Sequence, residues 1–287
     1  MIAGRALHYV FKVAKRAETM DFYRKILGMK ILRHEEFTQG CDAQCNGPYD
    51  NRWSKTMVGY GPESSHFVVE LTYNYGVTSY EMGNDFGGIT IRSSAVIERA
   101  KAANYPSTME NGKHILVSPG GYRFLIVNET QPTDRDPVMQ VTLNVTDIPK
   151  SVYYWNSTLQ MKIVVQTDNS AVLTYGENQA RLQLNKTSEP LNRAQAYGRI
   201  AFAVPGDVQP AIQETIKKNN WPILTDLIKL DTPGKASVRV IILADPDGHE
   251  ICFVDEEGFS ELSKVDPEGE ALLDKNIAKD PFEQQKA

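Results

Sequence analysis

Apolar and polar positions divide the start of the chain into strand-like runs around one helical stripe. Residues 6–13 and 29–37 are rich in β-branched and aromatic side chains, which suit a pleated sheet. Between them, residues 15–27 place apolar side chains at roughly helical spacing. Two more strands are predicted at 55–61 and 65–74. The predicted order is therefore β-α-β-β-β.

A second, more compact run follows the same order. A strand at 87–91 precedes a helix at 94–103, for which Ser93 is a suitable N-cap residue. Short strands come next, around Ser107 and at 114–117 and 122–127. Residues 131–137 are proline-containing and charged, so they break the pattern and read as a linker.

The chain then repeats itself. Leu27-Gly-Met-Lys-Ile31 returns as Leu159-Gln-Met-Lys-Ile163, and Gly87-Gly-Ile-Thr-Ile91 returns as Gly198-Arg-Ile-Ala-Phe202. Later, Tyr60-Gly61 matches Tyr175-Gly176. Matches that keep their order along both halves indicate an internal duplication. We therefore predict an α+β chain of four βαβββ modules in two tandem domains: 4–130 and 138–257, joined by the linker 131–137 and followed by a helical tail with a frayed end, 258–287.

Two segments stand out as carrying chemistry. The polar stretch 38–54 is too long for a hairpin turn and reads as a functional loop over a site. Glu70 lies in the middle of the apolar strand 65–74, where a carboxylate needs either an open face or a partner. One interpretation is an exposed edge-strand Glu, and the other is a metal ligand or a general base.

Composition narrows the class of protein. The 287 residues carry a net charge of -5, which does not suggest a nucleic-acid-binding surface. No apolar run approaches the roughly 18 residues that span a membrane. Three cysteines are too few for a disulfide framework and suit a reducing compartment, and we expect Cys41 and Cys45 to be free loop thiols rather than a zinc site. We expect a cytoplasmic protein, with a mitochondrial location as the alternative because basic residues precede the first acid, Glu18.

Three segments carry a resemblance to a known family. They are Phe22–Lys30 (FYRKILGMK), Glu70–Val77 (ELTYNYGV) and Asp245–His249 (DPDGH). Together with the four modules, they resemble the vicinal-oxygen-chelate superfamily and, within it, glyoxalase I. The resemblance implies that paired modules form half-open barrels whose cup holds a divalent metal of the Zn or Ni type. It also implies a metal-assisted proton shift that turns the hemithioacetal of methylglyoxal and glutathione into S-lactoylglutathione, with glutathione as co-substrate.

The family's four metal-ligand positions transfer only in part. In the first domain, His8 and Glu70 match, whereas Gly88 and Leu125 do not. In the second domain the four positions hold Gln140, Gln183, Arg199 and Cys252, with Glu250 on the same strand face as Cys252. The resemblance implies that the first two positions of one half face the last two of the other. The first cup would therefore hold His8, Glu70, Arg199 and Cys252, and the second cup, without carboxylates, is predicted not to bind metal.

Two interpretations of the first cup stay open. In one, a metal is bound by His8, Glu70 and either Glu250 or Cys252, with Glu70 also acting as the catalytic base. In the other, Arg199 pairs with Glu70 in place of the metal.

Substrate contacts implied by the resemblance are Lys12, Asn74 and Lys235, and their alternatives are solvated lysines and a turn asparagine. The corresponding functions are a glyoxalase I-like lyase acting on a small molecule in methylglyoxal detoxification, or a degenerate member that binds a small molecule or a protein partner without turnover. The sequence leaves the oligomeric state open.

Overall fold

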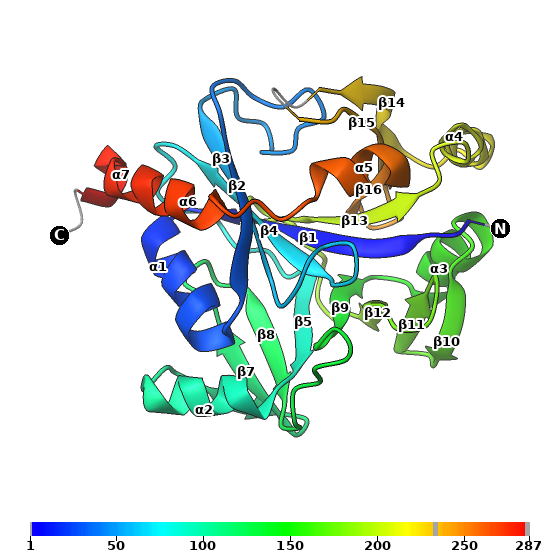
Figure 1. The fold of residues 1–287 in the computed structure, drawn as a ribbon. Coiled ribbons are helices and arrows are strands. Elements are labelled where there is room, and N and C mark those ends of the chain that lie inside the picture. Colours follow the sequence, from blue (N-terminus) through cyan, green and yellow to red (C-terminus); the bar gives the residue numbers. More distant parts are fainter. Residues whose placement is uncertain (1, 232–234, 285–287) are drawn as a thin grey trace.

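Four βαβββ modules and a helical tail form the protein in the computed structural model, which describes residues 2–231 and 235–284 (Figure 1). The first module comprises β1 (Arg5–Val13), α1 (Arg16–Asp21), η1 (Phe22–Leu27), β2 (Lys30–Phe37), β3 (Trp53–Gly59) and β4 (Val68–Asn74). The second comprises β5 (Phe86–Arg92), α2 (Ser94–Ala102), β6 (Thr108–Glu110), β7 (Lys113–Val117) and β8 (Arg123–Val127).

The second half of the chain repeats this order. The third module comprises β9 (Val138–Val145), α3 (Ile148–Val152), η2 (Tyr153–Thr158), β10 (Lys162–Gln166), β11 (Ser170–Thr174) and β12 (Arg181–Lys186). The fourth comprises β13 (Arg199–Val204), α4 (Gln209–Lys218), β14 (Ile223–Leu230), β15 (Val238–Ala244) and β16 (Glu250–Asp255). The predicted elements are thus present, with boundaries that shift by a few residues.

The modules combine across the two halves of the sequence. Sheet A has the order β14-β15-β16-β13-β1-β4-β3-β2, so it joins the first module to the fourth. Sheet B has the order β10-β11-β12-β9-β5-β8-β7-β6 and joins the second module to the third. In each sheet the junction is an antiparallel pair, β1 with β13 or β5 with β9. Each sheet therefore draws on both halves of the sequence repeat.

One large apolar core includes side chains from both sheets and the helices. Phe11 on β1 stacks on Tyr122 with ring centroids 3.9 Å apart, and it meets Phe86 on β5 edge to face. The opposite face of sheet A is the cup face, and it carries His8, Lys12 and Glu70 because side chains alternate along a strand. The fold thus places the candidate residues away from the main core.

The first helix departs from the expected single helix 15–27. It changes after Asp21 from α-helix to the wider π-helical η1, and Gly28 ends it with φ 71°. The same change recurs at η2 in the third module, which agrees with the internal repeat. Glycine suits the C-cap because a left-handed backbone carries no steric penalty without a Cβ.

The tail packs against the first module. It forms three helices, α5 (Glu256–Leu262), α6 (Gly269–Ala278) and α7 (Pro281–Gln284), whereas one or two were expected. The predicted frayed end extends outside the described residues. Figure 1 shows α6 running beside β2, with α7 near α1. Arg16, 1% exposed, fixes this arrangement through a 2.9 Å ion pair with Asp280. None of the helices in the described ranges is long and apolar enough to cross a membrane.

Candidate functional site

The cup face of sheet A brings together the residues expected in the first cup. Strand register places Glu250, Arg199, Val10 and Glu70 in one row across β16, β13, β1 and β4. The next row contains Cys252, Ala201 and His8. Positions from the two ends of the chain therefore share one surface.

Glu70 is buried at 6% exposure, and its strand lies between β1 and β3. The exposed edge-strand interpretation is therefore wrong. Its partner is the imidazole of His8, whose Nε2 lies 3.5 Å from Glu70 Oε2. The two retained ligand positions thus stand side by side.

A second carboxylate occupies the other nitrogen of His8. Glu63, from the turn between β3 and β4, places Oε1 2.5 Å from His8 Nδ1. Its other oxygen accepts a 3.0 Å hydrogen bond from Arg33 Nη1. Burial acts to raise the pKa of Glu63, but Arg33 and His8 outweigh it and hold the pKa below its ordinary value. Glu63 is therefore an ionised, buried link between an imidazole and a guanidinium.

Arg199 pairs with Glu250 rather than with Glu70, so the predicted Arg199–Glu70 pair is wrong. Its Nε and Nη2 donate to Glu250 Oε2 at 2.9 and 2.8 Å. The reason is the register: Val10 stands between Arg199 and Glu70, so their strands are two spacings, roughly 10 Å, apart.

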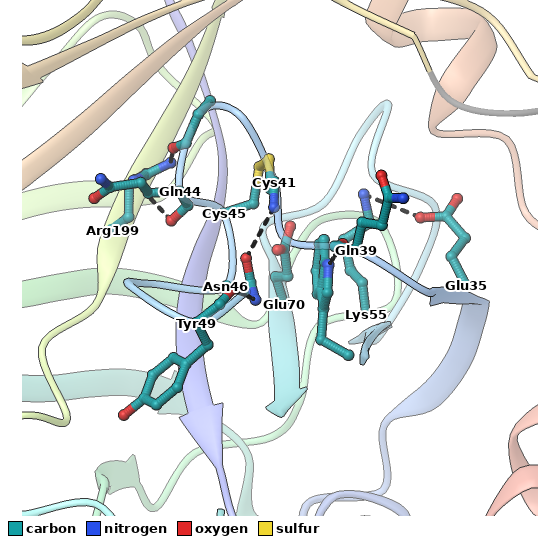
Figure 2. The surroundings of a disulfide bond; sticks show 12 residues. Glu35, Gln39, Cys41, Gln44, Cys45, Asn46, Tyr49, Lys55, Glu70 and Arg199 are labelled. Atoms are coloured by element: carbon teal, nitrogen blue, oxygen red, sulfur yellow. Dashed lines mark hydrogen bonds and ion pairs between the residues drawn. A yellow bond between two sulfur atoms is a disulfide. The ribbon is translucent and has the colours of Figure 1, made fainter. Parts of the chain in front are cut away.

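The loop between β2 and β3 closes the cup. Arg199 donates from Nη1 to the carbonyl of Ala43 at 3.0 Å and from Nη2 to that of Gln44 at 3.2 Å. Figure 2 shows this loop reaching Arg199 on one side, with Glu70 on the strand below. The cavity that remains beside Lys12 and Arg199 measures about 10 Å³. The predicted functional loop is thus a plug seated in the cup.

A disulfide joins Cys41 to Cys45 within this loop, with Cα atoms 5.4 Å apart (Figure 2). The expectation of two free thiols is therefore wrong. The residue spacing was compatible with a bridge, but only the turn of the loop, in which Gln44 N donates to Cys41 O, brings the two side chains together.

Lys12 is buried, so its interpretation as a solvated charge is wrong. Its ammonium donates to the carbonyls of Tyr197 at 2.7 Å and Gln195 at 3.2 Å, and it lies 3.3 Å from the centroid of the Tyr197 ring. Burial is the main reason that the pKa of Lys12 falls to about 7. Its hydrogen-bonding capacity is directed at the protein's own backbone.

Asn74 is also engaged internally and is fully buried. Its amide nitrogen donates to the carbonyl of Asn46 at 3.1 Å, and its oxygen accepts from Asn46 Nδ2 at 3.0 Å. The same amide nitrogen also donates to the hydroxyl of Tyr80 at 2.9 Å. The side chain of Asn74 therefore fixes the loop to β4, and its backbone carbonyl also begins the turn that follows, accepting from the N–H of Val77 at 3.2 Å.

Lys235 reaches a buried carboxylate on β2. Its Nζ donates to Glu35 Oε1 at 2.7 Å, while Lys55 lies 3.0 Å from Oε2 of the same carboxylate. Burial acts to raise the pKa of Glu35, but Lys55, Arg33 and Lys235 outweigh it and bring the pKa to about 2. Lys235 is thus ion-paired, and its 231–235 loop lies partly outside the described residues.

The second cup, on sheet B, has neutral residues at all four ligand positions. The amide of Gln140 donates to Gln183, and Gln183 donates in turn to Asn185 at 2.7 Å. Gly88 has φ 135°, and a Cβ there would clash with Cδ1 of Leu125. Leu125 therefore fills the space that a side chain at position 88 would need.

The residues of the first cup do not fit the four-ligand metal site that the family resemblance implies. His8 and Glu70 offer donors, but Arg199 is a permanent cation and holds Glu250. Burial raises the pKa of the Cys252 thiol to about 12, so this side chain brings no negative charge to the cup. Within residues 2–231 and 235–284, no group of three or more His, Cys, Asp or Glu side chains is placed to hold a metal ion.

Sequence reasoning missed the residues that complete this network: Glu63, Arg33, Glu35 and Lys55. Arg33 and Glu35 carried a signal, because both charges fall on one face of a predicted strand. Glu63 carried none, because it lies in the segment between two predicted strands.

Comparisons with known proteins agree with this fold. The Glyoxalase/Bleomycin resistance protein/Dioxygenase superfamily matches residues 5–128, and the Glyoxalase domain-containing protein 4-like C-terminal domain matches residues 147–262. "Glyoxalase domain-containing protein 4" of Mus musculus is 52% identical over 96% of this chain and 93% of its own length. This chain belongs to the glyoxalase domain-containing protein 4 family. A second relative is "Glyoxalase 1" of Caenorhabditis elegans. It is 47% identical over 98% of this chain and 99% of its own length.

A solved structure supports the same fold. Glyoxalase I from Zea mays superposes on the family member described here with a TM-score of 0.74 and 26% sequence identity, covering 90% of this chain and 94% of the maize chain. The predicted α+β vicinal-oxygen-chelate fold is thus confirmed.

Proposed function

We propose that this glyoxalase-family protein is a catalytically degenerate member of its family, in which fixed ion pairs replace the metal of the cup, and that it does not catalyse the glyoxalase I reaction. The observation that carries the proposal is Arg199. It occupies a ligand position, neutralises Glu250, and donates to two carbonyls of the loop that plugs the cup.

Electrostatics supports this proposal. A guanidinium keeps its charge at all physiological pH values, so Arg199 opposes a divalent cation at this position. Glu63 holds Nδ1 of His8, and Arg33 in turn holds Glu63, so His8 directs only its Nε2 toward Glu70. The positive charge that a metal would bring to Glu250 is thus already supplied by Arg199.

Access supports it as well. The loop from β2 to β3 leaves a cavity of about 10 Å³ beside Lys12, and a glutathione conjugate needs a pocket of at least several hundred Å³. The implied substrate contacts Asn74 and Lys12 form their hydrogen bonds within the protein. Asn74 donates to the carbonyl of Asn46, and Lys12 donates to the carbonyls of Tyr197 and Gln195.

The second candidate is a glyoxalase I-like lyase in methylglyoxal detoxification, with Zn²⁺ or Ni²⁺ and glutathione. The observation that favours it is the retained pair, His8 Nε2 and Glu70 Oε2, 3.5 Å apart. The relative from Caenorhabditis elegans named "Glyoxalase 1" supports it too. In this candidate Glu70 is the base and His8 a ligand.

Formation of S-lactoylglutathione from methylglyoxal and glutathione decides between the two. The full chain is assayed with added Zn²⁺, with added Ni²⁺ and with a chelator, alongside E70Q and the surface variant E256Q. We expect all samples to show only the spontaneous background rate. Turnover that survives in E256Q and disappears in E70Q would overturn the proposal and establish the lyase.

A further inference from the structure

We propose that sheet B carries an anion-binding site, formed by Arg92, Arg135 and Arg181, for a small molecule with a phosphate monoester group. These three guanidinium groups line one cavity of about 390 Å³ at an end of the sheet, next to Gln140. This volume lies within the range of ordinary small-molecule sites.

Two of the three cations of this cavity lack balancing charge. Arg92 pairs with Glu129 at 2.9 Å, but among the described residues neither Arg135 nor Arg181 has an ion-pair partner. Of the described residues lining the cavity, Asp136 alone has a carboxylate. An excess of positive charge in a concave site favours an anion.

Asp136 opposes an anion only weakly. Its Oδ2 accepts from the backbone N–H of Phe67 at 2.6 Å, and its Oδ1 accepts from that of Val138 at 2.9 Å. Both oxygens therefore serve the junction between the linker and the strands. Burial raises the pKa of Asp136 to about 7, which reduces its negative charge at neutral pH.

The internal repeat supplies an independent argument. Glu63 stands three residues after Tyr60, and Asn178 stands three residues after Tyr175 in the matching turn. In sheet A, Glu63 places the chain's own carboxylate between His8 and Arg33. In sheet B, Asn178 lines the arginine cavity and brings no charge. The matching turn of sheet B therefore supplies no carboxylate to the arginines of this cavity.

Phosphate suits this arrangement better than a single carboxylate. A phosphate monoester carries close to two negative charges and three acceptor oxygens, so it can satisfy several guanidinium groups at once. The amides of Gln140 and Asn178 add neutral donors at the same cavity. A neighbouring cavity of about 390 Å³, which shares Arg135 and Asn178 and includes His66, offers polar surroundings for the rest of the molecule.

Calorimetric titration of the full chain with inorganic phosphate tests the site, with sodium chloride at matched ionic strength and with succinate as comparisons. We expect saturable phosphate binding and no saturable heat with chloride. R135Q and R181Q should each weaken binding by about tenfold, as expected for the loss of one charge-assisted hydrogen bond. Arg123, on the same sheet and paired with Glu110, provides the control R123Q, which should bind like the wild type.

Several results would overturn the assignment. They are no saturable phosphate binding, tighter binding of succinate than of phosphate, or equal weakening in R123Q. Because Arg135 and Arg181 are exposed, their variants should fold, and circular dichroism checks this. The site is independent of the sheet A cup, so its failure would leave the proposed function untouched, and glyoxalase turnover would leave this site untouched.

Discussion

Replacing Glu63 by Gln tests whether the buried ion pairs hold the first cup together. The substitution keeps the size of the side chain but removes the charge between His8 and Arg33. Glu63 and Arg33 are only 1% and 2% exposed, so water cannot replace the lost partner. Arg33 would keep Glu35 as its nearest carboxylate, at 3.8 Å.

The expected loss of stability is large. Breaking a buried ion pair by removing one partner costs about 3–5 kcal/mol, because the remaining charge stays buried without compensation. The glutamine amide can still accept a hydrogen bond from Arg33, so we expect a decrease of about 3 kcal/mol in the free energy of unfolding for E63Q. The exposed pair of Lys101 and Glu98 gives the matched control E98Q, for which we expect about 0–1 kcal/mol.

The pH dependence gives the sign of the effect. Because the pKa of Glu63 lies below its ordinary value of 4.5 in the folded state, its stabilising contribution is complete above pH 4.5. That contribution is lost as the pH falls through the folded-state pKa. The difference in stability between wild type and E63Q should therefore be constant from neutral pH down to about 5 and shrink in acid.

Urea denaturation followed by tryptophan fluorescence, at several pH values, measures these quantities. A loss of stability for E63Q no larger than that for E98Q would refute the reasoning. A difference between wild type and E63Q that grew in acid would refute the assignment of an ionised Glu63.

Three further predictions concern the same cup. The double variant R199H/C252E removes the cation and supplies two metal-donor side chains opposite the retained ligand positions. We therefore expect stoichiometric Zn²⁺ or Ni²⁺ by elemental analysis. A metal content equal to that of wild type would contradict this prediction. With a pKa of about 7, the Lys12 ammonium should give one lysine side-chain NMR signal that titrates near neutrality and is absent in K12R. Lysine signals that all titrate near the ordinary value would count against the buried position. Loss of the disulfide in C41S/C45S should lower the free energy of unfolding by up to about 2 kcal/mol and speed hydrogen exchange in the loop between β2 and β3. Unchanged hydrogen exchange would contradict the role of this loop as a fixed plug.

The module order could be predicted because hydrophobic periodicity and the internal repeat reinforce each other. The strand at 29–37 and the helix at 94–103 follow directly from local patterns, and their boundaries move by only one residue. The π-helical turn at 22–27 could not be predicted, because an α-helix and a π-helix bury the same apolar residues at this length.

The composition of the cup could be predicted only in part. Register explains why: His8 and Glu70 share a cup face once β1 and β4 are parallel neighbours, and the resemblance implied this. The Glu63 contact depends on how the turn after Gly61 folds back onto β1, which no periodicity encodes. The separation of Arg199 from Glu70 likewise depends on the strand order, which puts β1 between β13 and β4 although these strands are distant in sequence.

Metal content of the wild-type protein tests the central claim most directly. The full chain, purified without chelators and dialysed against Zn²⁺ and Ni²⁺ in separate samples, is analysed for metal per polypeptide. The account predicts only traces, unchanged by H8A, because Arg199 occupies a ligand position with a permanent positive charge and neutralises Glu250. Stoichiometric metal that is lost in both H8A and E70Q would contradict it.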